Sequence, residues 1–238
     1  MTDGASGDYQ TPVLEGQGAS DYERYLRTDE LLSLQKTAQE QAHHDELLFQ
    51  TVHQSSELWL KLATSEVAEA TRLVDADDLP AALRLLRRAN GCVKIVTEAL
   101  EMLEHMSPWE YTEVRKVLGH GSGFDSPGFR TVQRESPELW RAFTEAHGRA
   151  GVTLVEVYTR GRELEDLYNL AEQLIEWDER VIVWRMRHVK MVERVIGIGV
   201  IGTQGTPVEV LTRLIHKSLF PELWDVRNEL TRLNPPAE

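Results

Sequence analysis

The feature that most constrains the fold is a segment from about residue 162 to residue 196 that carries the 3.6-residue period of an α-helix. Apolar residues recur in it at intervals of three and four, which places them along one stripe of a long helix. The segments at about 42–74 and 80–105 have the same period, and the only hint of a strand lies at 152–157. The sequence therefore predicts the all-α class: a helical bundle with long helices and glycine-rich connecting loops.

Serine, proline and glycine mark the ends of the predicted helices. Serine suits a helix N-cap and proline suits the first turn, so shorter helices are expected to begin near these positions: Ser20, Ser107-Pro108, Ser136-Pro137 and Pro207. The last of them is expected to continue into Phe220-Pro221 and the C-terminal tail. Residues 119–130 and 197–207 are rich in glycine, which predicts two irregular loops. Loops that a rigid scaffold holds often carry function.

Length and composition indicate the domain organisation. The chain has 238 residues, of which 41% are hydrophobic, and this is enough for one domain with a substantial core. Residues 1–18 are polar and contain glycine and serine, so they are expected to form a flexible N-terminal arm. Residues 19–238 are expected to form a single helical domain.

The charge of the chain argues against several classes of partner. The net charge is −13, and such an acidic surface repels phosphate backbones, so no nucleic-acid partner is expected. No membrane partner is expected either, because no run of about 18 apolar residues is present and the N-terminus does not resemble a signal peptide. Cys92 is the only cysteine, which leaves no intrachain disulfide and best fits a reducing cytoplasm.

His188 is the first candidate for chemistry. It falls in line with Leu174, Val181 and Val192 on the apolar stripe of the longest predicted helix. Such a residue can be a core histidine whose ring nitrogens are hydrogen-bonded to neighbours. It can also be an axial ligand, because haem iron takes a neutral imidazole that faces an apolar slot. The spacing alone does not distinguish the two interpretations.

Two further segments allow both a structural and a functional interpretation. His53 lies one helical turn after Phe49 and one before Glu57, as in a pocket wall or in a partly exposed helix. Arg130 ends the first glycine-rich loop, where it can be a surface residue or can bind a carboxylate with its planar guanidinium. Residues 202–206 can be a plain linker or can surround a polar group, but they lack the ending of a phosphate-binding loop.

Other enzyme classes need motifs that the chain lacks. A di-iron carboxylate bundle needs two Glu-x-x-His motifs, and only one occurs, from Glu40 to His43. The His-Glu-x-x-His motif of zinc proteases and the Gly-x-Ser-x-Gly turn of serine hydrolases are both absent.

The segment Asp45–Lys61, which reads DELLFQTVHQSSELWLK, resembles the signature of the tryptophan 2,3-dioxygenase family. Four more segments resemble the family in the same order: Tyr22–Leu26, Ser122–Phe124 with Phe129-Arg130, Trp184–Arg194 and Phe220–Trp224. The resemblance covers most of the chain from about residue 20, and five motifs in order are highly specific.

The resemblance implies a haem-dependent oxygenase that uses O2 to oxidise the indole C2–C3 bond of L-tryptophan or a close derivative. It implies haem b in a pocket between helices, with His188 as the axial iron ligand and Trp184 beside it. It further implies that His53 hydrogen-bonds the indole nitrogen and that Phe49 packs on the ring. The other expected substrate contacts are Arg130 at the carboxylate, Thr203 at the ammonium group, and Phe124 and Gln204 nearby.

The resemblance also implies an assembly of several copies. In the family the residues that match Tyr22 and Tyr25 reach into the pocket of a neighbouring subunit, so a homo-oligomer, a tetramer or a dimer, is expected.

Three departures from the family pattern surround the substrate. The interval between Arg130 and His188 is short, Gln204 stands where the family has glycine, and residues 125–128 replace more apolar ones. They indicate a diverged relative with a role in secondary metabolism. Three functions stay open: ring-opening dioxygenation, mono-oxygenation of tryptophan or β-methyltryptophan to an oxindole or hydroxyindole, and non-catalytic sensing of haem or an indole.

Overall fold

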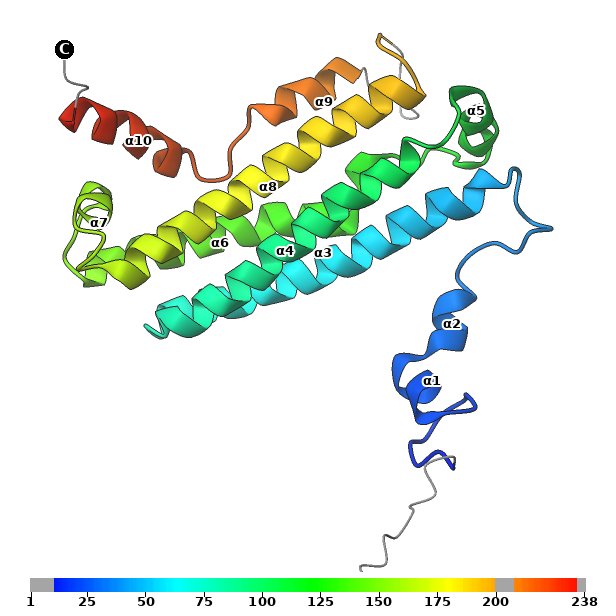
Figure 1. Ribbon diagram of the computed structural model, residues 1–238, viewed down its shortest axis with the longest axis horizontal. Coiled ribbons are helices and arrows are strands. Elements are labelled where there is room, and N and C mark those ends of the chain that lie inside the picture. Colours follow the sequence, from blue (N-terminus) through cyan, green and yellow to red (C-terminus); the bar gives the residue numbers. More distant parts are fainter. Residues whose placement is uncertain (1–10, 200–207, 235–238) are drawn as a thin grey trace, which may run out of the picture.

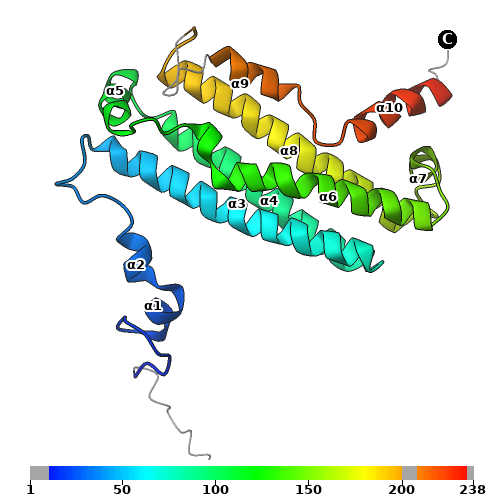
Figure 2. The ribbon, with the colours of Figure 1, turned by 180° about the vertical axis from the view of Figure 1, so that it is seen from behind.

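The computed structural model describes residues 11–199 and 208–234, and every regular element in these residues is a helix (Figure 1). The predicted all-α class is therefore confirmed. Four long helices form a bundle: α3 (Asp45–Asp75), α4 (Leu79–Leu103), α6 (Pro127–Arg149) and α8 (Glu165–Val195). Helix α4 packs against both α3 and α8, and α6 packs against α3 (Figure 2). Within the described residues, no helix has a stretch both long and apolar enough to cross a bilayer.

The helix starts follow the local signals in the sequence. Asp78 caps α4 by accepting a hydrogen bond from the Ala81 backbone N–H, and a proline occupies the first turn. Ser107 caps α5 (Pro108–Val117) through the Glu110 N–H in the same way. These contacts satisfy backbone donors that have no partner within the helix.

The prediction was wrong after the first glycine-rich segment. Instead of a loop to Arg130 and short helical pieces, α6 is one helix of 23 residues that contains Pro137. Ser126 caps it by accepting from the Phe129 N–H, so Arg130 lies in its first turn. Val132 and Leu139, on either side of Pro137, are both buried in the core. Packing along one face therefore outweighs the hydrogen bond that a proline removes.

Ser136 connects α6 to α8 inside the core. Its hydroxyl donates to the Val132 carbonyl (2.6 Å) and accepts from Trp177 Nε1 (3.0 Å). We expect Ser136→Ala to lower the free energy of unfolding by about 1–2 kcal/mol, because the buried indole N–H loses its acceptor. Urea denaturation measures this. Thr131→Ala, which removes a hydroxyl bonded only to the Pro127 carbonyl, is the control, and equal losses in the two variants would contradict the prediction.

The C-terminal part also differs from the predicted single helix. It forms α9 (Val208–Ile215) and α10 (Pro221–Leu233), joined by an irregular stretch. The buried Asp178 carboxylate of α8 accepts hydrogen bonds from the backbone N–H groups of Leu219 and Phe220 and from Trp224 Nε1. These three bonds hold the break between α9 and α10 against α8.

The hint of a strand at 152–157 was likewise wrong, because Leu154–Thr159 form the short helix α7. Thr153 caps it through a reciprocal pair of hydrogen bonds with Glu156. This capping box is a helix-start signal that outweighs the β-branched residues around it.

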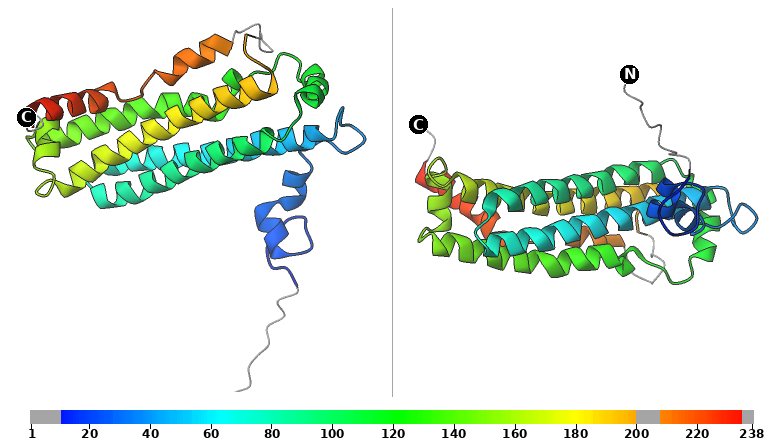
Figure 3. Two further views of the ribbon diagram at one scale, coloured as in Figure 1. Left: turned by 45° about the horizontal axis from the view of Figure 1, so that its top comes forward. Right: turned by 90° about the horizontal axis from the view of Figure 1, so that it is seen from below.

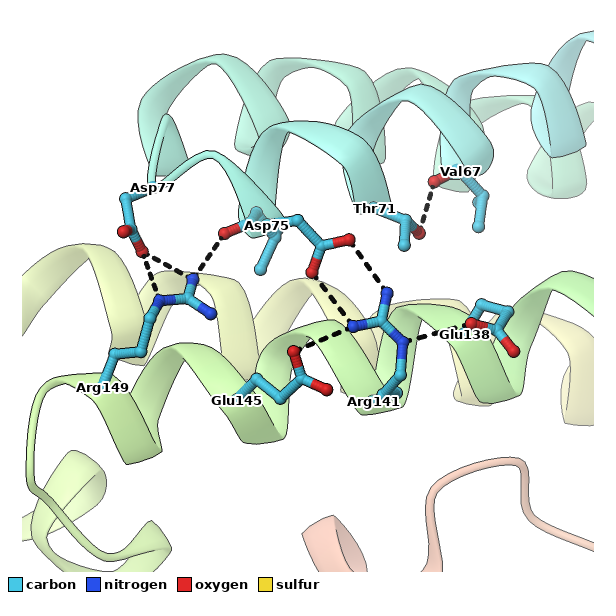
Figure 4. A network of polar contacts seen from close by, with 9 residues as sticks. Val67, Thr71, Asp75, Asp77, Glu138, Arg141, Glu145 and Arg149 are labelled. Atoms are coloured by element: carbon cyan, nitrogen blue, oxygen red, sulfur yellow. Dashed lines mark hydrogen bonds and ion pairs between the residues drawn. The ribbon is translucent and has the colours of Figure 1, made fainter.

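The end of the bundle remote from His53 is joined by ion pairs (Figure 4). Arg141 of α6 binds Asp75 at the end of α3, and Arg149 binds Asp77 just beyond it. Exposed pairs of this kind each contribute little to stability. They join the C-terminal half of α6 to the C-terminal end of α3.

The N-terminal segment stands away from the bundle (Figure 3). It contains α1 (Asp21–Leu26) and α2 (Thr28–Leu32), neither of which has a buried residue. Its base is attached to α3, where Gln50 accepts from the Lys36 backbone N–H and Glu46 pairs with the Lys36 ammonium. The division into an arm of residues 1–18 and a domain of residues 19–238 stays a prediction.

Candidate functional site

A cavity of 360 Å³ lies between α3, α5, α8 and the connecting segment, residues 118–126, which joins α5 to α6. Its lining includes Phe49, His53 and Glu57 from α3, Tyr111 from α5, Ser122, Gly123, Phe124 and Ser126 from the connecting segment, and His188, Met191, Val192 and Val195 from α8. Leu103, Met106, Leu118, Ile196 and Leu211 line it as well, so most of the lining side chains are apolar. Four residues singled out in the sequence, namely Phe49, His53, Phe124 and His188, therefore meet at one cavity.

A second cavity of 170 Å³ adjoins the first and shares His188, Gly123 and Phe124 with it. Arg130 and Trp184 line only this smaller cavity. His188 thus stands between the two spaces, and Arg130 is on a different side from Phe49 and His53.

His188 has the properties of a neutral ligand. Burial disfavours the imidazolium form and, with a smaller contribution from His53, lowers the pKa of His188 to about 4. The ring stacks on Trp184, with centroids 5.0 Å apart and planes inclined by 11°. At Gly123 an added Cβ would lie 3.8 Å from Nε2 of His188, so the connecting segment passes beside the free edge of the ring.

These residues fit a haem. A neutral imidazole that opens onto an apolar cavity is the donor that haem iron takes. Trp184 Nε1 is buried and has no hydrogen-bond partner among the described residues, so it is available to an acceptor in the smaller cavity. A haem carries carboxylates that can accept this bond, and Arg130 adds a positive charge on the same side.

His53 faces the larger cavity from α3. Its Nδ1 lies 2.7 Å from the Phe49 carbonyl oxygen, and its ring centroid lies 4.0 Å from that of Phe49. Burial lowers the pKa of His53, although the Phe49 carbonyl and Glu57 partly offset this effect. A carbonyl oxygen only accepts, so Nδ1 carries the proton of the neutral ring. Nε2 is then left as a hydrogen-bond acceptor.

Two residues of α5 were missed in the sequence. Tyr111 lines the larger cavity, 6.2 Å from the Phe49 ring. Burial raises the pKa of Tyr111, and the nearby guanidinium of Arg115 partly opposes this shift. Arg115 is half-buried, and it shares a helix face with Tyr111 and Leu118, which both line the cavity. The sequence signal that could have identified them is the four-residue spacing of Tyr111 and Arg115, which places both on one helix face just before the glycine-rich loop.

Other predicted site residues do not meet at the cavity. Tyr22 and Tyr25 lie on α1, 68% and 78% exposed, in the segment that stands away from the bundle. Thr203 and Gln204 lie outside the described residues.

Comparison with known proteins identifies relatives that match most of the chain. The family model for tryptophan 2,3-dioxygenase matches residues 7–136 and 141–230. The tryptophan 2,3-dioxygenase of Myxococcus xanthus is 34% identical over 90% of this chain and 91% of its own length. That of Caulobacter vibrioides is 34% identical over 88% of this chain and 98% of its own length, and that of Bacillus anthracis is 31% identical over 88% and 92%.

The length of one alignment also shows a shortening of this chain relative to that protein. The alignment with the Myxococcus protein spans 266 positions although only 90% of these 238 residues take part, so that relative has residues missing here. The family match is interrupted at 137–140, within the interval between Arg130 and His188. Helix α6 runs through this point without a break.

Proposed function

The chain belongs to the tryptophan 2,3-dioxygenase family, and on that basis we propose that it is a haem-dependent enzyme that uses O2 to cleave the indole C2–C3 bond of L-tryptophan or a close derivative. The observation that carries the proposal is the meeting of His188, His53 and Phe49 at one apolar cavity. A sensor of haem or indole does not need this complete set.

His188 is proposed as the residue that would ligate the haem iron, with Trp184 stacked beside it. The bound haem supplies the O2 chemistry, while the chain binds and orients the substrate and excludes water. We propose haem b, held without a covalent link, because the only cysteine is Cys92 and it is buried in the core. A covalently attached haem needs a Cys-x-x-Cys-His motif, which the sequence does not contain.

The indole end of the substrate is assigned to α3. Phe49 offers an aromatic face on which an indole ring can pack. His53 Nε2 is the acceptor for the indole N–H, because Nδ1 is held by the Phe49 carbonyl. Phe124, which lines both cavities, would add apolar surface beside the indole. In this way Phe49 and His53 would fix the orientation of the indole whose C2–C3 bond reacts.

The amino-acid end is assigned to Arg115. Arg115 shares the face of α5 that lines the larger cavity, whereas Arg130 lines the smaller one. We therefore place the substrate carboxylate at Arg115 and the carboxylates of the haem near Arg130 and Trp184. Thr203 and Gln204 remain proposed for the ammonium end.

An assembly of two or four copies is also proposed. Tyr22 and Tyr25 are exposed aromatic residues on a segment that contacts the bundle only at its base. In an oligomer this segment can reach the cavity of a neighbouring copy. A reducing cytoplasm is proposed from the single, buried cysteine, and a role in secondary metabolism from the polar residues at 125–128.

The experiment counts oxygen atoms. The haem-loaded, reduced protein is incubated with tryptophan under 18O2, and mass spectrometry measures the labelled atoms in the product. We expect two labelled atoms in a ring-opened product. One labelled atom in an oxindole or hydroxyindole would overturn ring-opening dioxygenation in favour of mono-oxygenation. Haem and indole binding with no product would indicate a sensor.

A further inference from the structure

Glu57 connects the helix that carries His53 to the start of α6. One of its carboxylate oxygens accepts a hydrogen bond from the Ser126 hydroxyl, and the other accepts from the Gly128 backbone N–H at 2.9 Å. These partners are 69 and 71 residues away in the chain. Glu57 also lies one turn after His53, so the contact is made beside the larger cavity.

The contact depends on a close approach of the two helices. Gly128 is buried, and an added Cβ there would lie 2.7 Å from Leu60 Cβ and 2.8 Å from the Glu57 carboxylate. Only glycine fits this space without a shift of α6. Ser126, which donates to Glu57, also caps α6 by accepting from the Phe129 N–H at 3.2 Å. Glu57 is thus the charged end of a short chain of hydrogen bonds at the helix N-terminus.

The segment held in this way borders both cavities. Ser126 lines the larger cavity, and Gly123 and Phe124 line both, beside His188. Ser122 and Asp125 form a capping box around residues 123–125. This compact turn is therefore expected to move together with Ser126, which bonds to Glu57. A shift at Ser126 would therefore change the width of the space between His53 and His188.

We propose that Glu57 is a positioning residue that sets the fit of the substrate, by holding the connecting segment against α3 at a fixed distance from His53. The inference rests on the proposed function, since it assigns the substrate to this cavity. Glu57 lines the cavity, but both of its carboxylate oxygens are bonded to Ser126 and Gly128, so we expect its effect to be on substrate binding.

The test compares Glu57→Gln with the unmodified enzyme, both full-length and haem-loaded. Glutamine keeps the size of the side chain but presents an N–H2 group to one of the two donors. We expect the KM for tryptophan to rise about tenfold while kcat stays within about twofold, because a charged hydrogen-bonded contact is lost away from the reacting bond. The Soret band and the haem content should not change.

A matched control and a second variant separate positioning from general stability. Glu66→Gln alters another glutamate of α3, which pairs with Arg88 outside the cavity, and it should leave KM unchanged. Ser126→Ala removes one of the two bonds and should raise KM in the same direction. Combined with Glu57→Gln it should add little, because the two residues share one contact. An unchanged KM in Glu57→Gln, or an equal rise in Glu66→Gln, would overturn the proposal.

A measurement that does not depend on enzyme activity separates the role of Glu57 from the proposed function. Phe124 is 40% exposed, and chymotrypsin cleavage after it reports how firmly the connecting segment is held. Cleavage should be faster in Glu57→Gln than in Glu66→Gln. If the unmodified protein does not oxidise tryptophan, the proposed function fails while this comparison still tests the role of Glu57. Equal cleavage rates would refute the positioning role by itself.

Discussion

The variant His188→Ala is expected to purify without haem, with less than about a tenth of the haem content of the unmodified protein, because the axial ligand is lost. His188 offers a neutral imidazole, since burial lowers its pKa to about 4. The other α8 residues that line the larger cavity are Met191, Val192 and Val195, and Ile196 follows directly after the helix. None of these residues provides an imidazole. The measurement is the ratio of Soret to protein absorbance, checked by haem extraction.

The control for this variant is His147→Ala. His147 lies near the end of α6, where Nδ1 is 2.9 Å from the Val152 carbonyl oxygen, and it borders neither cavity. Its haem content should be unchanged. Added imidazole should restore part of the Soret band in His188→Ala by occupying the emptied position. Full haem content in His188→Ala without imidazole would show that another residue binds the iron.

The variant Arg115→Gln is expected to raise the KM for tryptophan about 100-fold, because the substrate carboxylate loses a charge-assisted pair in a partly buried site. The loss falls mainly on binding, since the carboxylate is remote from the indole bond that reacts. Steady-state kinetics measure it, and the haem spectrum of the resting enzyme should stay as it is.

Two controls test the role of Arg115: the variant Arg130→Gln and the substrate analogue tryptamine. Arg130 lines the smaller cavity, so its variant should change KM less than about tenfold. Tryptamine has no carboxylate, and its binding to the haem-loaded protein should therefore be nearly the same with and without Arg115. If Arg130→Gln caused the larger loss, the substrate carboxylate would have to lie in the smaller cavity.

The helical class and the approximate bounds of α3, α4, α5 and α8 were predictable because their causes are local. The 3.6-residue period of α3, α4 and α8 follows from the need to bury one stripe of each helix. The starts of α4 and α5 follow from Asp78 and Ser107, whose side chains bond to backbone groups three residues ahead. The resemblance also predicted one site for Phe49, His53 and His188, and the structure brings these three side chains to one cavity.

The errors have causes that lie far away in the sequence. Ser136-Pro137 is a good local start for a helix, but Val132 and Leu139 bury one continuous face and α6 does not break. The last predicted helix divides because Asp178 of α8 binds the backbone some 40 residues ahead, at Leu219 and Phe220. The residues near each position do not indicate either the buried face of α6 or the hydrogen bonds of Asp178.

The sequence by itself determined the all-helical class and the positions of α3, α4 and α8, because periodicity and capping act over one or two turns. Only the tertiary structure decided that Arg130 lines the smaller cavity and not the one that Phe49 and His53 line, and that Glu57 holds the connecting segment. Those properties depend on how α3, α5, α6 and α8 pack. Packing joins side chains that are many residues apart, and local spacing does not encode it.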